Sequence, residues 1–423
     1  MDEKIKLDIS EQDLAQAFTS KTKAKPAGQS PKNKMTKCQI AMLISGMLGF
    51  LAGAVCILYG VIASDISDDS QKTAIAFPKI PSEKTAEETY SKLTGEVLAD
   101  GVAVDAPTYC IQTPNGTDGA RPQAGLNQAG VIFEAIAEAG ITRFAAIYQN
   151  PSSAVIGPIR SLRIYYLQWD TPFDCTIVHA GGADDAIAAV RAGGYKDLSE
   201  NYAYMYRGTY GVRLWNNLFT TATYLQQFSD DNDNATSNVK GFARMTPAES
   251  ARARIDGLAN EKLEITTPAS GDTSVLNPAV TAVGLRFGGW ANFNVNYSYD
   301  AGSNTYLRSY ESGVPHEVYD CPNEDLGERN PEDVCSLTQM APAVVVALMV
   351  DEGKASDNYH EDITTIGSGE AYIFQNGMAV QATWHKDSVS DQIRFTDASG
   401  AEIKLAPGQT IVSAVPNYGS VEY

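Results

Sequence analysis

Six ionisable side chains that could bind an anion or move a proton lie close together in one apolar part of the chain. They are Arg121, Glu134, Arg143, Arg160, Arg163 and His179. Burying a charged group without a partner is costly, so these side chains must pair with one another or with a ligand. We therefore expect them to line a pocket at the carboxyl edge of a sheet.

Glu134 and Arg143 lie on two neighbouring predicted elements. Apolar residues recur at helical spacing after Asn127, which predicts a helix over 127–139, and a strand over 142–148 follows it. A Glu134–Arg143 ion pair would fix the helix against the strand. Alternatively, both side chains contact a ligand, with Glu134 as an acid or base.

Arg160 and Arg163 are three residues apart in a predicted helix over 160–170. Residues at this spacing share one face of a helix, so the two guanidinium groups would lie side by side. Such a pair suits a phosphate, a pyrophosphate or a carboxylate. The alternative is that the two arginines pair with Asp170 and Asp174.

His179 ends a predicted buried strand over 175–179, and Gly181 and Gly182 form the turn into a predicted helix over 183–192. Ligands of α/β folds bind at the carboxyl ends of strands, where His179 would be an acid or base near neutral pH. Two aspartates occupy the first turn of that helix and would satisfy its free amides, which argues against a phosphate ligand there. A hydrogen-bonded structural histidine is the alternative.

The N-terminal part predicts a membrane anchor. Residues 38–63 (CQIAMLISGMLGFLAGAVCILYGVIA) carry no charge and are long enough to span a ~30 Å hydrocarbon layer. Lysines precede this segment, so we expect a cytoplasmic tail over 1–37 and an extracytoplasmic stalk over 64–91. Its glycines allow a homodimer through the membrane helix. A cleaved signal peptide and acylation at Cys56 are the alternatives, although the bulky Val55 fits the latter poorly.

Charge and cysteine content restrict the function further. The net charge is −19, and the acidic excess lies after residue 64, which argues against nucleic acid as a partner. Cys321 and Cys335 bracket a polar loop and are expected to form a disulfide, which leaves Cys110 and Cys175 as the second pair. No zinc spacing or nucleotide loop is present, so we expect no metal and no cofactor.

Several short motifs beyond residue 92 resemble those of the YerB-like lipoproteins, a bacterial envelope family of unknown function. The matching segments are Leu93–Gly95, Arg207, Arg213–Asn217, Tyr306–Arg308, Gly313–His316, Thr383–Lys386 and Pro407–Thr410. The resemblance adds Arg207, Arg213 and Asn217 to the candidate ligand-binding residues, but it implies no reaction. Trp215 and Asn216 stand where the family has Pro-His. We expect His316 to cap a turn.

The patterns predict an α/β fold followed by a mostly antiparallel β domain. Strands alternate with helices in an N-terminal domain over 92–240, a helix and loop over 241–274 follow, and the β-rich domain covers 275–423. Within this last domain, Asn376-Gly377 predicts a tight hairpin.

The function that the sequence favours is that of a membrane-anchored envelope protein without catalytic activity. It would bind a cell-wall component or a wall-synthesis protein in an arginine-lined cleft. The alternative is an enzyme that acts on wall glycan or on a pyrophosphate-linked lipid carrier, with His179 or Glu134 as acid or base. A purely structural ectodomain is the third possibility.

Overall fold

The computed structural model describes residues 88–208, 215–262 and 280–423. In these ranges no helix has the length and apolar character needed to cross a membrane. The predicted tail, the membrane segment 38–63, nearly all of the stalk and Arg213 lie outside the described residues. Residues 75–423 form one compact unit.

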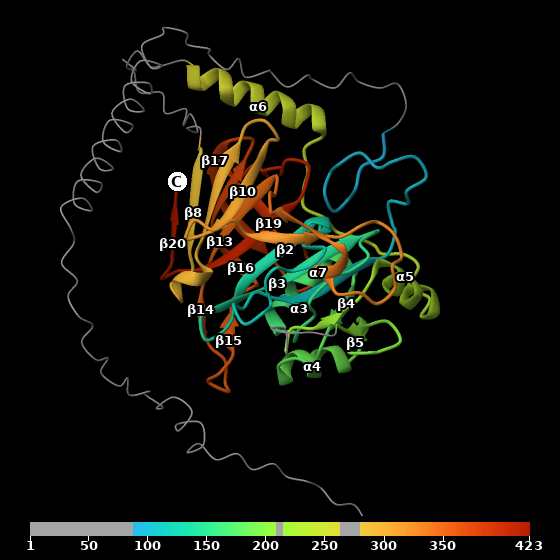
Figure 1. Cartoon of the computed structure of the whole chain (residues 1–423). Coiled ribbons are helices and arrows are strands. Elements are labelled where there is room, and N and C mark those ends of the chain that lie inside the picture. Colours follow the sequence, from blue (N-terminus) through green and yellow to red (C-terminus); the bar gives the residue numbers. More distant parts are fainter. Residues whose placement is uncertain (1–87, 209–214, 263–279) are drawn as a thin grey trace, which may run out of the picture. The chain divides into compact units, whose positions relative to one another are not determined.

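A ten-stranded sheet runs through this unit in the order β18-β17-β16-β13-β19-β2-β3-β1-β4-β5 (Figure 1). Its strands are β1 (Thr108–Pro114), β2 (Val131–Glu138), β3 (Ile141–Gln149), β4 (Thr176–His179), β5 (Lys196–Ser199), β13 (Val344–Val350), β16 (Gly367–Gln375), β17 (Met378–Lys386), β18 (Arg394–Thr396) and β19 (Thr410–Pro416). β19 pairs in parallel with both β2 and β13. The predicted domains 92–240 and 275–423 therefore contribute strands to one continuous sheet.

A second sheet has the order β10-β9-β8-β20 and is formed by β8 (Ala282–Arg286), β9 (Val295–Asp300), β10 (Thr305–Tyr310) and β20 (Ser420–Glu422). Three two-stranded sheets pair β6 (Tyr206–Arg207) with β7 (Leu218–Phe219), β11 (Glu317–Asp320) with β12 (Ser336–Gln339), and β14 (Glu352–Lys354) with β15 (Glu361–Ile363). The helices are η1 (Leu126–Gln128), α3 (Ile164–Asp170), η2 (Thr171–Phe173), α4 (Asp184–Arg191), α5 (Ala222–Asp231), α6 (Pro247–Lys262), η3 (Ala291–Phe293) and α7 (Pro331–Val334).

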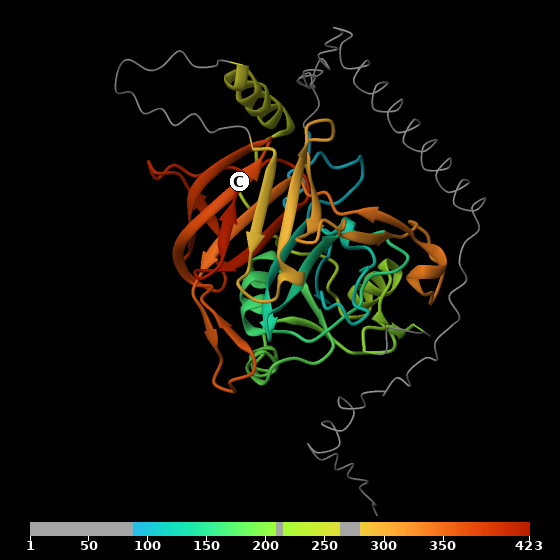
Figure 2. The ribbon, with the colours of Figure 1, turned by 60° about the vertical axis from the view of Figure 1, so that its left-hand side comes forward.

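Both faces of the large sheet are covered. On one face, Tyr165, Tyr166 and Trp169 of α3 pack in a core with Phe133 and Val346. On the other face, the second sheet contributes Leu285, Val295 and Tyr297 to a core with Ile132 and Phe374. Figure 2 shows the yellow strands β8 to β10 in front of the orange and red strands of the large sheet.

The predicted helix over 127–139 is wrong. Only Leu126–Gln128 forms a single 3-10 turn, and Val131–Glu138 is strand β2, in which every residue is buried. A strand that is covered on both faces is apolar on both sides, so it lacks the alternation that marks a half-exposed strand. Its apolar residues then also match a helical spacing by chance.

The predicted helix over 160–170 begins only at Ile164, and Arg163 precedes it with an extended backbone. Residues 160–162 instead pair with the turn after β4: the amide of Ala180 donates to Arg160 O (3.0 Å) and the amide of Leu162 donates to Gly181 O (3.0 Å). Arg160 and Arg163 therefore do not share a helical face, and this prediction is wrong.

Other predicted elements are confirmed. They are strand β3, strand β4, helix α4, and the β16–β17 hairpin that turns at Asn376-Gly377. Disulfides join Cys110 to Cys175 and Cys321 to Cys335, as predicted.

Candidate functional site

Glu134 is fully buried and forms an ion pair with an arginine that the sequence analysis did not select. Its two carboxylate oxygens accept hydrogen bonds from Arg308 Nη1 and Nη2 at 2.9 and 2.8 Å. The hydroxyls of Thr142 and Ser413 also donate to it. The expected Glu134–Arg143 pair is wrong, because Glu134 faces the second sheet whereas Arg143, opposite Ala135 in the register, faces α3.

Arg308 belongs to a closed network of buried polar groups. Its Nε donates to His316 Nδ1 (2.9 Å), and the other ring nitrogen of His316 lies 3.1 Å from Gln123 Oε1. Burial, and then the charge of Arg308, holds the pKa of His316 well below its usual value. The predicted turn cap is wrong, because this neutral histidine links Arg308 to the amide of Gln123.

The network continues to Arg121 at its outer end. Gln123 Nε2 donates to Asn115 Oδ1 (3.1 Å), and Arg121 Nε donates to the same oxygen (2.9 Å). The guanidinium of Arg121 lies 4.0 Å from the centre of the Tyr310 ring. Burial lowers the pKa of Arg121, and the nearby charge of Arg308 adds to the effect. Arg121 and Glu134 therefore belong to one network, from which Arg143 and Arg163 are separated by the sheet.

Two arginines, Arg143 and Arg163, contact Glu138 on the opposite face of the sheet, and the charge of Arg160 lies near Arg143. A bulge after Ile136 directs Glu138 toward Arg143, and these two side chains form an ion pair. The second carboxylate oxygen of Glu138 lies 2.7 Å from Arg163 Nη2. The carbonyl of Ser161 accepts hydrogen bonds from both arginines. The Nε atom of Arg160 is buried without a partner. Burial lowers the pKa of Arg143, and repulsion from Arg163 and Arg160 lowers it further.

The alternative partners that the sequence offered to Arg160 and Arg163 are engaged elsewhere. Asp170 accepts a hydrogen bond from Gln112 Nε2 (2.9 Å), and its burial raises its pKa well above the usual value. Asp174 pairs with Lys196 at 3.2 Å. Neither aspartate therefore neutralises this arginine cluster, which consists of Arg143, Arg160 and Arg163.

His179 and Glu134 are closed to solvent, with exposed fractions of 1% and 0%. The ring nitrogens of His179 lie 2.7 Å from Gly181 O and 2.9 Å from Asp197 Oδ1. A Cβ atom on Gly182 would lie 3.0 Å from Leu162 O, so this glycine permits the close approach of two chain segments. This geometry favours the structural interpretation of the 179–182 turn.

Arg207 and Asn217 form a separate surface network. Arg207 Nη1 donates to Asn217 Oδ1 (2.8 Å), and its other guanidinium nitrogens contact Tyr202 and Glu200. The six predicted residues thus separate into the Arg308 network, the arginine cluster and the His179 turn rather than meeting in one pocket.

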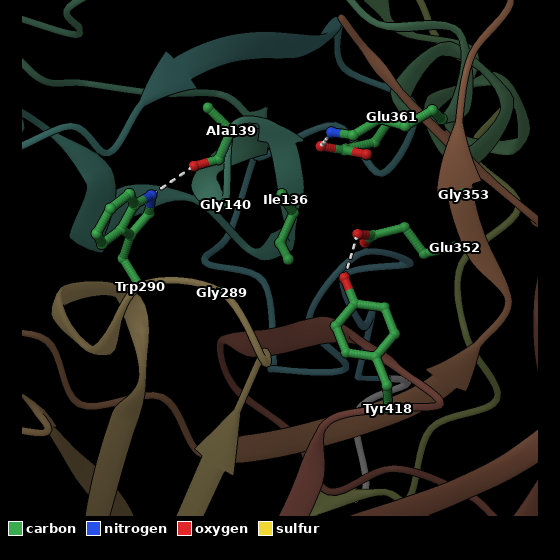
Figure 3. A pocket seen from close by; sticks show the side chains of 10 residues that line it. Ile136, Ala139, Gly140, Gly289, Trp290, Glu352, Gly353, Glu361 and Tyr418 are labelled. Atoms are coloured by element: carbon green, nitrogen blue, oxygen red, sulfur yellow. Dashed lines mark hydrogen bonds and ion pairs between the residues drawn. The ribbon is translucent and has the colours of Figure 1, made fainter. Parts of the chain in front are cut away.

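A pocket of about 530 Å³ lies where β2 ends, beside the β14–β15 hairpin (Figure 3). Its lining residues are Ile136, Ala139, Gly140, Gly289, Trp290, Glu352, Gly353, Lys354, Glu361 and Tyr418. None of the six predicted residues, all of which are described, is among them. The pocket was not predicted from the sequence, because its residues come from separate segments and form no motif.

Two aromatic side chains of the pocket are exposed but fixed in place. Trp290 and Tyr418 are 66% and 61% exposed. Trp290 Nε1 donates to Ala139 O (2.7 Å), and the Tyr418 hydroxyl donates to Glu352 Oε1 (2.6 Å), as the dashed lines in Figure 3 show. The Trp290 ring lies against Gly140, where a Cβ atom would be 3.0 Å from Trp290 Cδ1. Both rings are thus held in position before any ligand arrives.

Two carboxyl groups complete the pocket. Burial raises the pKa of Glu352 to about 7, and its Oε2 atom is buried without a hydrogen-bond partner. Glu361 is only 5% exposed and forms an ion pair with Lys354. Glu352 can therefore gain or lose a proton near neutral pH, and its Oε2 atom has an unused capacity for a hydrogen bond.

Comparison with known proteins identifies relatives of the whole folded part. Residues 93–236 match the model described as "Protein of unknown function (DUF3048) N-terminal domain", and residues 284–412 match its C-terminal counterpart. "Putative lipoprotein YerB" of Bacillus subtilis (strain 168) is 25% identical over 342 residues, which cover 79% of this chain and 88% of the relative. A crystal structure of the YerB protein from Bacillus subtilis matches with a TM-score of 0.61 and 19% identity, covering 79% of this chain and 100% of that chain, so the two share a fold.

Proposed function

Because this chain belongs to the DUF3048 family of YerB-like proteins, we propose that it is a membrane-anchored envelope protein that binds a cell-wall glycan in the pocket of Figure 3. The name of its relative, a lipoprotein, supports attachment to a membrane. In this chain the uncharged segment 38–63 is the proposed anchor, with residues 1–37 in the cytoplasm and the folded part outside.

The observation that carries the glycan proposal is the pair of exposed, hydrogen-bonded aromatic rings. Large aromatic side chains usually lose water contact on folding, so a rigid exposed pair in a pocket indicates a binding surface. Sugar rings present apolar C–H faces that pack on aromatic rings, and their hydroxyls donate hydrogen bonds to carboxylates. Trp290 and Tyr418 supply the first kind of contact, and Glu352 and Glu361 supply the second.

The proposal is tested by calorimetric titration of the full chain in detergent with a β-1,4-linked N-acetylhexosamine oligosaccharide. Trp290→Ala removes one ring and should weaken binding at least tenfold, which is about 1.4 kcal/mol. Trp215→Ala is the matched control, because Trp215 is 68% exposed and lies outside the pocket. Equal losses in both variants, or no binding by the unmodified chain, would contradict the proposal.

An enzymatic function at the same pocket is the second candidate, and the proton affinity of Glu352 favours it. A carboxyl group with a pKa of about 7 beside a second carboxylate is the arrangement of an acid catalyst that cleaves glycosidic bonds. Prolonged incubation with the oligosaccharide, followed by mass spectrometry, tests this candidate. Products formed by the unmodified chain but not by Glu352→Gln would establish it; intact oligosaccharide would leave only binding.

A further inference from the structure

The arginine cluster carries an uncompensated positive charge close to the pocket. Arg143 and Arg163 share one carboxylate, Glu138, and the nearby charge of Arg160 repels that of Arg143, so three positive charges face one negative charge. Arg143 and Arg163 are 9% and 4% exposed, and such burial makes mutual repulsion expensive. No ion pair joins the side chain of Arg160 to any other described residue. A bound anion would remove this cost.

The cluster and the pocket share the end of strand β2. Ile136 and Ala139 line the pocket, and Glu138 lies between them in the chain. The Tyr165 hydroxyl donates to Ile136 O (2.9 Å), and the charged groups around it are Arg163, Arg143, Glu138 and also Glu352 of the pocket. The charges of both sites therefore act on the Tyr165 hydroxyl, and a ligand longer than a single sugar would extend from the pocket toward the arginines.

We propose that Arg143, Arg160 and Arg163 bind a phosphoryl group of the same ligand whose sugar part occupies the pocket, so that the ligand class is a phosphorylated glycan. This inference rests on the proposed glycan-binding function. A phosphomonoester carries a charge of roughly −1.5 to −2 at neutral pH, which matches the two unpaired positive charges. Guanidinium groups also fit phosphate oxygens with paired hydrogen bonds, and Arg160 Nε has such a donor unused.

Charge balance distinguishes this interpretation from a structural ion-pair network. A structural network would place a second carboxylate against the cluster. Asp170 is the fully buried acid on the adjoining helix, but it contacts Gln112 and favours its neutral form. Asp174 at the end of this helical segment pairs with Lys196. The described residues thus supply one negative charge for the three positive charges of the cluster, and an anionic ligand would supply the others.

The test uses the full chain in detergent with three probes: a β-1,4-linked N-acetylhexosamine disaccharide, its 1-phosphate, and inorganic phosphate. The unmodified chain should bind the sugar phosphate at least tenfold more tightly than the neutral disaccharide. Arg160→Gln should abolish this difference and leave the affinity for the neutral disaccharide unchanged. Because Arg160 forms no ion pair with a described residue and repels Arg143, the Arg160→Gln variant should unfold at a temperature no lower than that of the unmodified chain. Arg160→Lys keeps the charge but loses the planar guanidinium, so it should give an intermediate affinity.

Arg394→Gln is the matched control, since it removes an arginine that is 46% exposed and distant in sequence from the cluster. An equal loss of sugar phosphate binding in this variant would show a general charge effect and overturn the inference. Equal affinity of the unmodified chain for both disaccharides would overturn it while leaving the glycan pocket intact. Arg160-dependent binding of inorganic phosphate, without binding of either disaccharide, would refute the proposed function and show a free-phosphate site instead.

Discussion

Removal of both partners of the Glu134–Arg308 ion pair should destabilise the fold by no more than removal of either one alone. Both side chains are 0% exposed, and Arg308 donates to both oxygens of Glu134. Glu134→Gln leaves a buried guanidinium without its counter-charge, which costs about 3–5 kcal/mol. Arg308→Met leaves a buried carboxylate and should cost a similar amount.

The double variant Glu134→Gln/Arg308→Met contains no buried charge. Its free energy of unfolding should fall by about 3–5 kcal/mol, because His316 Nδ1 loses its donor Arg308 Nε and only one acceptor oxygen remains for the hydroxyls of Thr142 and Ser413. The sum of the single losses should therefore exceed the loss of the double variant by about 3 kcal/mol.

Urea unfolding of residues 75–423 with intact disulfides, followed by tryptophan fluorescence, measures these free energies. Trp169 is 2% exposed and reports the core directly. The exposed pair Glu249–Lys404 is the control, and its loss should cost less than about 1 kcal/mol. A coupling below about 0.5 kcal/mol between Glu134 and Arg308, or a Glu134→Gln variant as stable as the unmodified chain, would refute the structural role assigned to this pair.

Three further predictions concern the pocket, the loop disulfide and the membrane anchor. The pKa of Glu352 is raised from 4.5 to about 7, so its protonated form stabilises the fold at low pH, and this contribution is lost as the pH rises through 7. After a discount for partial exposure, the free energy of unfolding should fall by about 1–2 kcal/mol between pH 5 and 8 in denaturant titrations. The Glu352→Gln variant should lack this fall. Cys321→Ser/Cys335→Ser opens a loop of sequence separation 14 and should lower the free energy of unfolding by about 3 kcal/mol in denaturant titrations, and no change would contradict the loop-entropy argument. Protease added to intact, wall-stripped cells should remove the folded part and spare an N-terminal tag, whereas a mature chain that begins at Cys56 or later would exclude an anchor over 38–63.

The sequence correctly predicted the elements that are determined by residues close together in the chain. Asn376-Gly377 produces the β16–β17 turn because both residues adopt positive φ, at 56° and 74°. Helix α4 begins and ends within one residue of its predicted bounds, because its first-turn aspartates and the glycines after it mark both ends. β2 was misassigned because burial on both faces removes the alternation of a half-exposed strand.

The site was predicted less well, because long-range pairing determines which charges meet. Arg308 is 174 residues from Glu134, and no pattern around either residue indicates the other. Arg143 was paired with Glu134 and Arg163 with Arg160 in the prediction, but Arg143 and Arg163 meet at Glu138, which a bulge turns toward them. The pocket depends on Trp290, Glu352 and Tyr418, which only the folded chain brings together.

The position of β19 in the large sheet imposes an order of events on biogenesis. This strand lies between β13 and β2, so residues 410–416 join the segments that begin at residues 131 and 344. If residues 38–63 hold the chain in the membrane, the N-terminal segment reaches the outside first and remains without β19 until residues 410–416 have crossed. Until nearly the entire chain has crossed, the apolar edge of β2 has no partner on that side. A chain truncated before residue 410 would retain both family domains almost complete, yet it would lack the strand that unites them.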